Sequence, residues 1–283
     1  MIRIAIQSKG RLNEESVELL KDAGVKIDDQ KRKFLGRAAN FPLEVLYLRD
    51  DDIPEVVADG SADIGIVGFN EVCETGADVS VVRRLGFGQC RISLAVPKEV
   101  NYQSPDWFNG KTIATSYPEV LKRYLAEKGI EASVRVIKGS VEIAPAAGIA
   151  DAIFDIVSSG GTLVSNGLKE VERVLESEAV LVAGKNLSDE KKALLDSLLF
   201  RIDAVSDSRG KKYILMNLPA DKVDEAIAIL PAMRSPTVMP LAAEGWCSLH
   251  SVVKDCDLWD KVEKLKALGA EGILVLHLDK VIE

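Results

Sequence analysis

The hydrophobic pattern of roughly the first 180 residues alternates between short apolar runs and longer amphipathic stretches. Short apolar runs predict buried strands, and apolar residues spaced three and four apart predict helices. The predicted strands cover residues 3–7, 43–48, 63–67, 79–82, 91–96, 111–115, 133–137, 151–157 and 179–182. Strands that alternate with helices indicate βαβ units and parallel sheet, so the pattern predicts an α/β fold.

Several predicted helices carry sequence signals at their ends. Asn13 is a candidate N-cap for a helix that ends at Gly24. Residues 52–55 (Asp-Ile-Pro-Glu) and 116–119 (Ser-Tyr-Pro-Glu) both have the spacing of a capping box with an early proline. These signals predict one helix after each of three early strands.

Changes of pattern divide the chain into three predicted domains. The first lobe covers 1–90, joined by about 183–207, and the second lobe covers 91–182. Residues 187–205 predict a long amphipathic helix capped by Ser188, followed by a linker at 207–210. Residues 208–283 predict β-α-β-β-α-β, a ferredoxin-like order, with strands at 211–218, 237–241, 248–253 and 272–278 and helices at 221–230 and 257–268. This last domain shows no catalytic cluster, which favours a regulatory or assembly module.

Composition and charge exclude several classes of function. No apolar run approaches the roughly 20 residues of a membrane helix, and the N-terminal stretch lacks the apolar region of a signal peptide. We therefore predict a cytoplasmic protein that does not bind a membrane. A net charge of −8 argues against a nucleic-acid partner, although a local group of basic residues could still bind a nucleotide.

The cysteines and histidines predict no zinc centre. Four cysteines lack the CxxC spacing, and two histidines lie outside any HExxH context: Cys73, Cys90, Cys247, Cys256, His250 and His277. Buried free thiols are the more ordinary interpretation, because a free cysteine packs as a small hydrophobic residue.

The stretch DAIFDIVSSGGTL (151–163) joins a strand-like half to a loop of hydroxyls and glycines. Ligands of parallel α/β sheets bind beyond the carboxyl ends of strands. Glycines let backbone N–H groups approach a ligand, and hydroxyls beside a helix that begins near Thr162 suit a monophosphate. Asp151 and Asp155 would repel a phosphate unless they bind ribose hydroxyls or Mg²⁺, so the stretch favours a phosphorylated sugar. A Ser/Gly turn before a helix is the alternative.

The segment 142–163, EIAPAAGIADAIFDIVSSGGTL, resembles the signature of the ATP phosphoribosyltransferases of histidine biosynthesis. The matching positions are Glu142, Gly148, Ile153, Asp155, Ser159, Gly160, Thr162 and Leu163. Ser159 stands where threonine is more frequent, which keeps the hydroxyl. Blocks resembling the family also occur in order at 7–12, 49–54, 63–68, 84–91, 111–118 and 235–241, and the tail is similar to that of the long form.

The resemblance implies an enzyme, a pentosyltransferase that catalyses the first step of histidine biosynthesis. N1 of the ATP adenine would attack C1′ of 5-phosphoribosyl-1-pyrophosphate (PRPP), and pyrophosphate would leave with Mg²⁺. Two periplasmic-binding-protein-like α/β lobes would enclose the site. The ferredoxin-like (ACT-like) tail would bind histidine as a feedback inhibitor and support a homo-oligomer, dimer or hexamer.

The resemblance also implies roles for individual residues. The PRPP site would be formed by Glu142, Asp155, Ser158, Ser159, Gly160, Gly161 and Thr162. The ATP site would be formed by Lys9, Arg11, Arg49, Arg91 and Tyr117. Glu142 and Asp155 would also meet the metal, mostly through the substrate. The histidine site would include Met233, Thr237 and Val252.

Other interpretations compete with each of these assignments. A two-lobed small-molecule binding protein without catalysis would have a secretion signal and no phosphate chemistry. A catalytically dead regulatory subunit would be expected to have lost Asp155, Ser159, Gly160 and Thr162, which are all present. Tyr117 could be an ordinary packed aromatic residue, and a Glu in a first helical turn also suits the helix dipole.

Overall fold

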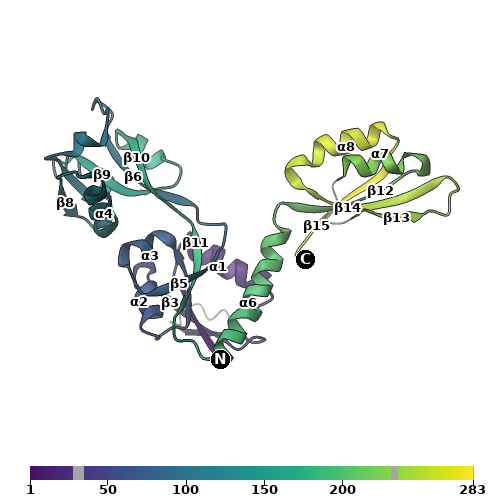
Figure 1. Ribbon diagram of the computed structural model, residues 1–283, viewed down its shortest axis with the longest axis horizontal. Coiled ribbons are helices and arrows are strands. Elements are labelled where there is room, and N and C mark those ends of the chain that lie inside the picture. The colour runs from purple at the N-terminus through teal and green to yellow at the C-terminus, as the bar shows by residue number, and fades with distance from the viewer. Residues whose placement is uncertain (28–34, 231–234, 283) are drawn as a thin grey trace. The chain divides into compact units, whose positions relative to one another are not determined.

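A computed structural model describes residues 1–27, 35–230 and 235–282 (Figure 1). The chain divides into two compact units, Met1–Ser197 and Leu198–Glu283. The first unit contains two sheets, and the second contains one. In the described ranges no helix is both long and apolar enough to cross a membrane.

The first sheet, which we call lobe I, has the strand order β2-β3-β1-β4-β11-β5. Its strands are β1 (Ile2–Gln7), β2 (Leu35–Arg37), β3 (Leu43–Leu48), β4 (Ile64–Gly68), β5 (Val79–Arg84) and β11 (Ala179–Gly184). β1 runs parallel to β3 and β4, whereas β11 is antiparallel to β4 and β5. Its helices are α1 (Arg11–Asp22), α2 (Ile53–Ala58) and α3 (Phe69–Thr75).

The second sheet, which we call lobe II, has the order β10-β6-β9-β7-β8. Its strands are β6 (Cys90–Pro97), β7 (Thr112–Thr115), β8 (Ser133–Val136), β9 (Ala152–Val157) and β10 (Leu168–Ser177). Its helices are α4 (Pro118–Lys128) and α5 (Gly161–Ser165). β7, β8 and β9 are parallel, and β6 is antiparallel to β9 and β10.

The chain crosses between the lobes twice, after β5 and after β10. This confirms the predicted plan of two α/β lobes. Because β11 pairs with β4 and β5, the chain re-enters the sheet of lobe I at residue 179, a few residues before the predicted boundary. Strand β10 was not predicted from the sequence, since bulges at 170/172 and 173/175 interrupt its alternation of apolar and polar residues.

The second unit contains a four-stranded antiparallel sheet in the order β13-β14-β12-β15. Its strands are β12 (Lys211–Pro219), β13 (Thr237–Pro240), β14 (Trp246–Lys254) and β15 (Glu271–His277), and its helices are α7 (Val223–Ile229) and α8 (Leu258–Ala267). Apolar residues of both helices share one core with alternate residues of β12 and β14, so both helices cover the same face. Element order and strand order confirm the ferredoxin-like prediction.

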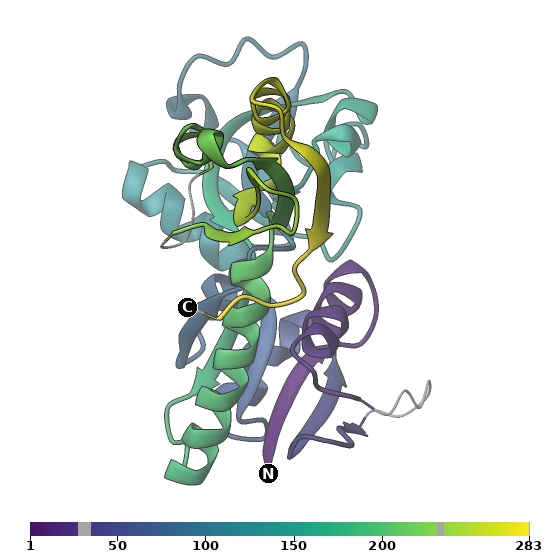
Figure 2. The same cartoon turned by 90° about the vertical axis from the view of Figure 1, so that its right-hand side faces the viewer.

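Two segments complete the list of elements. The helix α6 (Asp189–Ser208) is continuous across the division between the units, beyond the predicted end at residue 205 (Figure 2). It includes residues 207 and 208 of the linker predicted at 207–210, and β12 begins at residue 211. Short 3₁₀ helices cover Asp50–Asp52, Pro105–Phe108, Val141–Ile143, Ala220–Lys222 and Asp255–Asp257.

The predicted helix caps were only partly right. The backbone N–H of Lys191 donates to Ser188 Oγ, as predicted for α6. Asn13 is not a cap, because α1 already begins at Arg11 and the Asn13 amide donates to the carbonyl of Gln7. Neither of the two predicted capping boxes forms, since α2 and α4 lack a side-chain cap from their own N-cap residue.

Candidate functional site

The hydroxyl- and glycine-rich loop follows β9 directly and turns into α5. Gly160 has a φ of 82°, a left-handed conformation that favours glycine. A Cβ atom placed there would meet nothing within 4 Å, so the backbone is open to an approaching ligand. A cavity of about 300 Å³ is lined by the loop together with Glu142 and Asp155.

The structure brings the predicted PRPP residues together around this cavity. Its lining includes Glu142, Asp155, Ser158, Ser159, Gly160 and Thr162. Gly161 lies in the same loop, where its N–H donates to Ser159 Oγ at 3.4 Å. The loop presents hydroxyls and backbone N–H groups, which suit a phosphate, and the two acids lie beside it. Asp151 instead accepts from the backbone N–H of Thr112 at 2.8 Å.

Asp155 is affected by its burial and by the neighbouring acid. Burial, and to a smaller extent the charge of Glu142, raise the pKa of Asp155 to about 6, while a hydrogen bond from the Ile156 backbone acts in the opposite direction. No group of three or more His, Cys, Asp or Glu residues that could hold a metal ion occurs in the described part of the chain. Mg²⁺ is often bound by one or two carboxylates together with substrate phosphates, a pattern that this pair fits.

Glu142 is carried by a strained turn that sequence reasoning missed. Among the described residues, Ser140 is the one non-glycine residue with a positive φ, at 52°. It lies directly before the 3₁₀ helix Val141–Ile143 that carries Glu142. Backbone strain of this kind often occurs at ligand sites, and here it lies two residues before an acid that lines the cavity.

Arg91 contacts the loop from β6. Its Nη1 donates to the carbonyl of Ser158 at 2.9 Å, and its Nε and Nη2 donate to the two carboxylate oxygens of Glu170 at 2.6 Å each. This pairing lowers the pKa of Glu170 to about 2. Arg91 and Ser158 also line a neighbouring cavity of about 480 Å³. Arg91 therefore anchors the loop, and Glu170, on the unpredicted strand β10, holds Arg91.

The other basic residues predicted for ATP gather at one edge of lobe I. Lys9 and Arg11 follow β1, and Arg49 follows β3. β1 and β3 are adjacent and parallel, with Gln7 opposite Leu48, so all three residues lie near the same carboxyl edge. Lys9 is exposed, Arg11 pairs with Glu15 at 3.1 Å, and Arg49 pairs with Asp51 at 3.2 Å.

The Tyr117 side chain is more buried than a residue that stacks openly on a ligand would be. Its side chain is 8% exposed and belongs to the core of lobe II. Its hydroxyl lies 3.1 Å from Glu71 Oε1 and 3.2 Å from Asn70 Nδ2, both on α3 of lobe I. The phenol edge of Tyr117 therefore borders lobe I.

The residues predicted to bind histidine lie in the second unit. Thr237 is on β13, opposite His250, and Val252 is two residues beyond His250 on β14. Side chains two residues apart on a strand point to one face, so Thr237 and Val252 share the face that α7 and α8 leave open. Met233 lies outside the described residues.

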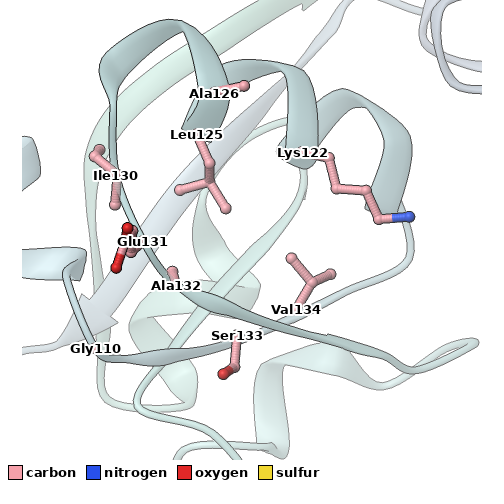
Figure 3. Close-up of a pocket in the computed structure, with 9 residues that line it drawn as sticks. All are labelled: Gly110, Lys122, Leu125, Ala126, Ile130, Glu131, Ala132, Ser133 and Val134. Carbon is pink, nitrogen blue, oxygen red and sulfur yellow. The ribbon is translucent and has the colours of Figure 1, made fainter.

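A separate cavity of about 530 Å³ lies at the far edge of lobe II, between α4 and β8 (Figure 3). Its lining is mostly aliphatic, and Lys122 and Glu131 are its charged members. It includes none of the residues predicted for PRPP or ATP.

Fold and site together define a class: a two-lobed α/β protein with an added βαββαβ domain and a hydroxyl-rich loop beside two carboxylates. The family model described as ATP phosphoribosyltransferase matches residues 49–204, and the one described as HisG, C-terminal domain matches 208–280. The chain therefore belongs to the ATP phosphoribosyltransferase family.

Individual relatives agree with the family models. The ATP phosphoribosyltransferase of Bacteroides thetaiotaomicron is 58% identical over 282 residues, covering 100% of both chains. That of Cytophaga hutchinsonii is 55% identical and covers 100% of this chain and 99% of the relative. A solved ATP phosphoribosyl transferase (HisG:HisZ) complex from Thermotoga maritima contains a chain similar to this one, with a TM-score of 0.62 and 29% identity. The match covers 71% of this chain and 98% of the solved one.

Proposed function

We propose that the protein transfers the phosphoribosyl group of PRPP to N1 of ATP and releases pyrophosphate, the first step of histidine biosynthesis. One observation carries the proposal. In a member of this family, the signature loop and the acids Glu142 and Asp155 line one cavity at the end of β9. A phosphate-binding loop and two acids match the two ends of a ribose phosphate.

Each group has a physical role in this reaction. The loop 158–162 would bind the 5′-phosphate through hydroxyls and backbone N–H groups. Asp155 and Glu142 would bind the ribose hydroxyls and, mostly through substrate oxygens, Mg²⁺, which would neutralise charge on the departing pyrophosphate. Adenine N1 is already a nucleophile, so the protein needs to align the substrates and stabilise the positive charge that develops on the ribose. The two carboxylates supply negative charge at that position.

ATP is proposed to bind across from PRPP. The basic edge formed by Lys9, Arg11 and Arg49 would bind the polyphosphate, Arg91 would support the loop between the substrates, and Tyr117 would border the adenine. We place the reaction in the cytoplasm. Incubation with ATP, PRPP and Mg²⁺ should produce a new ultraviolet absorbance and an equal amount of pyrophosphate. Folded protein that gives neither would contradict the proposal.

We further propose that residues 208–283 form a regulatory domain that binds histidine and joins copies of the chain into a dimer or hexamer. The open face of its sheet supports this. Leu274 and Leu276 lie opposite Leu215 and Tyr213 on that face and are 55% and 49% exposed, and Met239, opposite Ser248, is 45% exposed. An apolar sheet face of this kind suits a subunit interface.

Histidine binding can be tested on the same face. Thr237→Arg places a bulky cation at an exposed position, so the fold should be kept. The histidine concentration for half inhibition should rise at least about tenfold, as expected for losing one or two hydrogen bonds. Asp260→Arg, on an exposed position of α8, is the control and should keep normal inhibition. Equal inhibition of all three proteins would place the histidine site elsewhere.

A further inference from the structure

Glu71 is a buried acid that none of the roles above uses. It lies on α3 of lobe I, and the residue is 7% exposed. Its Oε1 accepts from Asn70 Nδ2 at 2.7 Å and from the hydroxyl of Tyr117 at 3.1 Å. Because Tyr117 belongs to lobe II, this hydrogen bond joins the two lobes.

The hydrogen bonds around Glu71 form a closed network. Asn70 Nδ2 also donates to the Tyr117 hydroxyl at 3.2 Å. Asn70 Oδ1 accepts from Ser177 Oγ at 2.8 Å, and the backbone N–H of Asn70 donates to the same Oγ at 3.0 Å. Ser177 ends β10, the strand from which the chain returns to lobe I. A buried polar network with satisfied partners fixes one arrangement of its side chains.

The same helix also holds the backbone around Tyr117. The two carboxylate oxygens of Glu74 accept from the N–H groups of Glu119 and Val120 at 2.9 Å each, so lobe I caps α4. Arg123 of α4 donates to the carbonyl of Cys73. Tyr117 immediately precedes α4, and α3 packs against this helix (Figure 1). Both the hydroxyl and the chain position of Tyr117 therefore depend on α3.

We propose that Glu71 is a positioning residue for the nucleotide: it holds the Tyr117 hydroxyl across the boundary between the lobes and so fixes the ring that borders the adenine. The inference rests on the proposed function, because it places Tyr117 in the ATP site. Loss of the Glu71 carboxyl group leaves the Tyr117 hydroxyl without its acceptor and loosens the contact between α3 and α4.

Glu71 is ionisable, so its protonation couples ATP binding to pH. Burial, and to a smaller extent the nearby acids Asp50, Asp51 and Glu74, raise its pKa to about 7 against the opposing effect of the Tyr117 hydrogen bond. The titratable groups of Tyr117 and Cys90 also interact with Glu71, and burial raises the pKa of both. A polyanionic nucleotide adds negative charge nearby. ATP binding near neutral pH should therefore draw a proton onto Glu71.

Substitutions at Glu71 distinguish a role in positioning Tyr117 from a role in the stability of the fold. Glu71→Leu removes the acceptor and should raise the KM for ATP about tenfold, the effect of one lost hydrogen bond, while the KM for PRPP changes less than about twofold. Glu71→Gln keeps a neutral acceptor and should restore a near-normal KM for ATP. In a Tyr117→Phe background, Glu71→Leu should add little, because the hydroxyl through which it acts is already absent.

Glu172 provides a matched control. Its Oε1 accepts from the hydroxyl of Tyr102 at 2.6 Å, the same pair of groups but within lobe II. Glu172→Leu and Glu172→Gln should leave both KM values unchanged. An equal rise in the KM for ATP in Glu172→Leu would show a general loss of stability and overturn the positioning role.

Calorimetry of ATP binding in two buffers of different ionisation enthalpy measures the proton directly. The wild-type protein should take up a fraction of a proton near pH 7, because Glu71 is already partly protonated there, and Glu71→Gln should lack this uptake. An unchanged or lower KM for ATP in Glu71→Leu overturns the inference while the transferase function stands. Wild-type protein that binds ATP with this proton uptake but gives no product with PRPP contradicts the function and keeps the inference. Absence of ATP binding overturns both.

Discussion

Substitution of one side chain in the loop after β9 should change substrate binding without changing the stability of the fold. The Thr162 side chain is exposed beside the cavity, and valine has nearly the same shape. Thr162→Val should raise the KM for PRPP about tenfold through the loss of one hydrogen bond to phosphate. Its free energy of unfolding should change by less than about 0.5 kcal/mol.

Ser165 gives the comparison for this change. Its hydroxyl donates to the carbonyl of Gly161 within α5, and it does not line the cavity. Steady-state kinetics of Ser165→Ala should therefore match the wild type. If Thr162→Val also matches it, the phosphate assignment of the loop is wrong.

The raised pKa of Asp155 predicts that kcat/KM for PRPP depends on pH. Its pKa is raised to about 6, so the carboxylate is charged above that pH and neutral below it. Since the charged form would bind ribose or metal, kcat/KM for PRPP should fall as the pH decreases through about 6. Asp155→Asn should lose about a hundredfold in kcat/KM at pH 8 and should no longer show this step. A step that persists in the variant belongs to another group.

The helix α4 is capped from outside its own segment. Glu74 of α3 accepts from two of its first N–H groups, whereas the capping box predicted at 116–119 does not form. Glu74→Ala should lower the free energy of unfolding of the protein by about 1 kcal/mol, as for other lost caps. Glu127→Ala, at an exposed position of the same helix, should change it by less than about 0.5 kcal/mol. Equal effects in urea denaturation would show that the contact is not a cap.

The strand β10 also depends on partners elsewhere in the chain. Its residues are mostly polar, and two bulges break the alternation that identifies strands in a sequence. Pairing with β6 keeps it in place, and through Glu170 it holds Arg91 and the loop. The unpredicted element therefore supports the predicted site.

The exposed apolar face of the sheet in the second unit predicts that copies of the chain associate through this face. Leu274→Asp places a charge on the exposed apolar face, so it should break the proposed oligomer into smaller species in light scattering or sedimentation. Trp259→Asp is the control, because Trp259 is 75% exposed on α8, in the layer on the other side of the sheet. An unchanged mass for Leu274→Asp, or a wild-type monomer, would contradict assembly through this face.

The sequence by itself determined the fold class, the ferredoxin-like tail and the loop that lines the cavity. These follow from local patterns: apolar runs predict strands, and a continuous segment, 142–163, contains both acids and the loop. Such features involve residues close together in the chain, so their spacing is visible without a structure.

The tertiary structure alone decided how distant residues meet. Three contacts join residues 45 to 107 positions apart: the cap that α3 gives α4, the pairing of Arg91 with Glu170, and the buried network that links Asn70 and Glu71 to Tyr117 and Ser177. No local pattern marks such partners, because a buried acid on an amphipathic helix looks like a solvated one until the second lobe covers it. Burial raises the pKa of Glu71, and its hydrogen bond to Tyr117 of lobe II makes it a candidate for positioning the nucleotide.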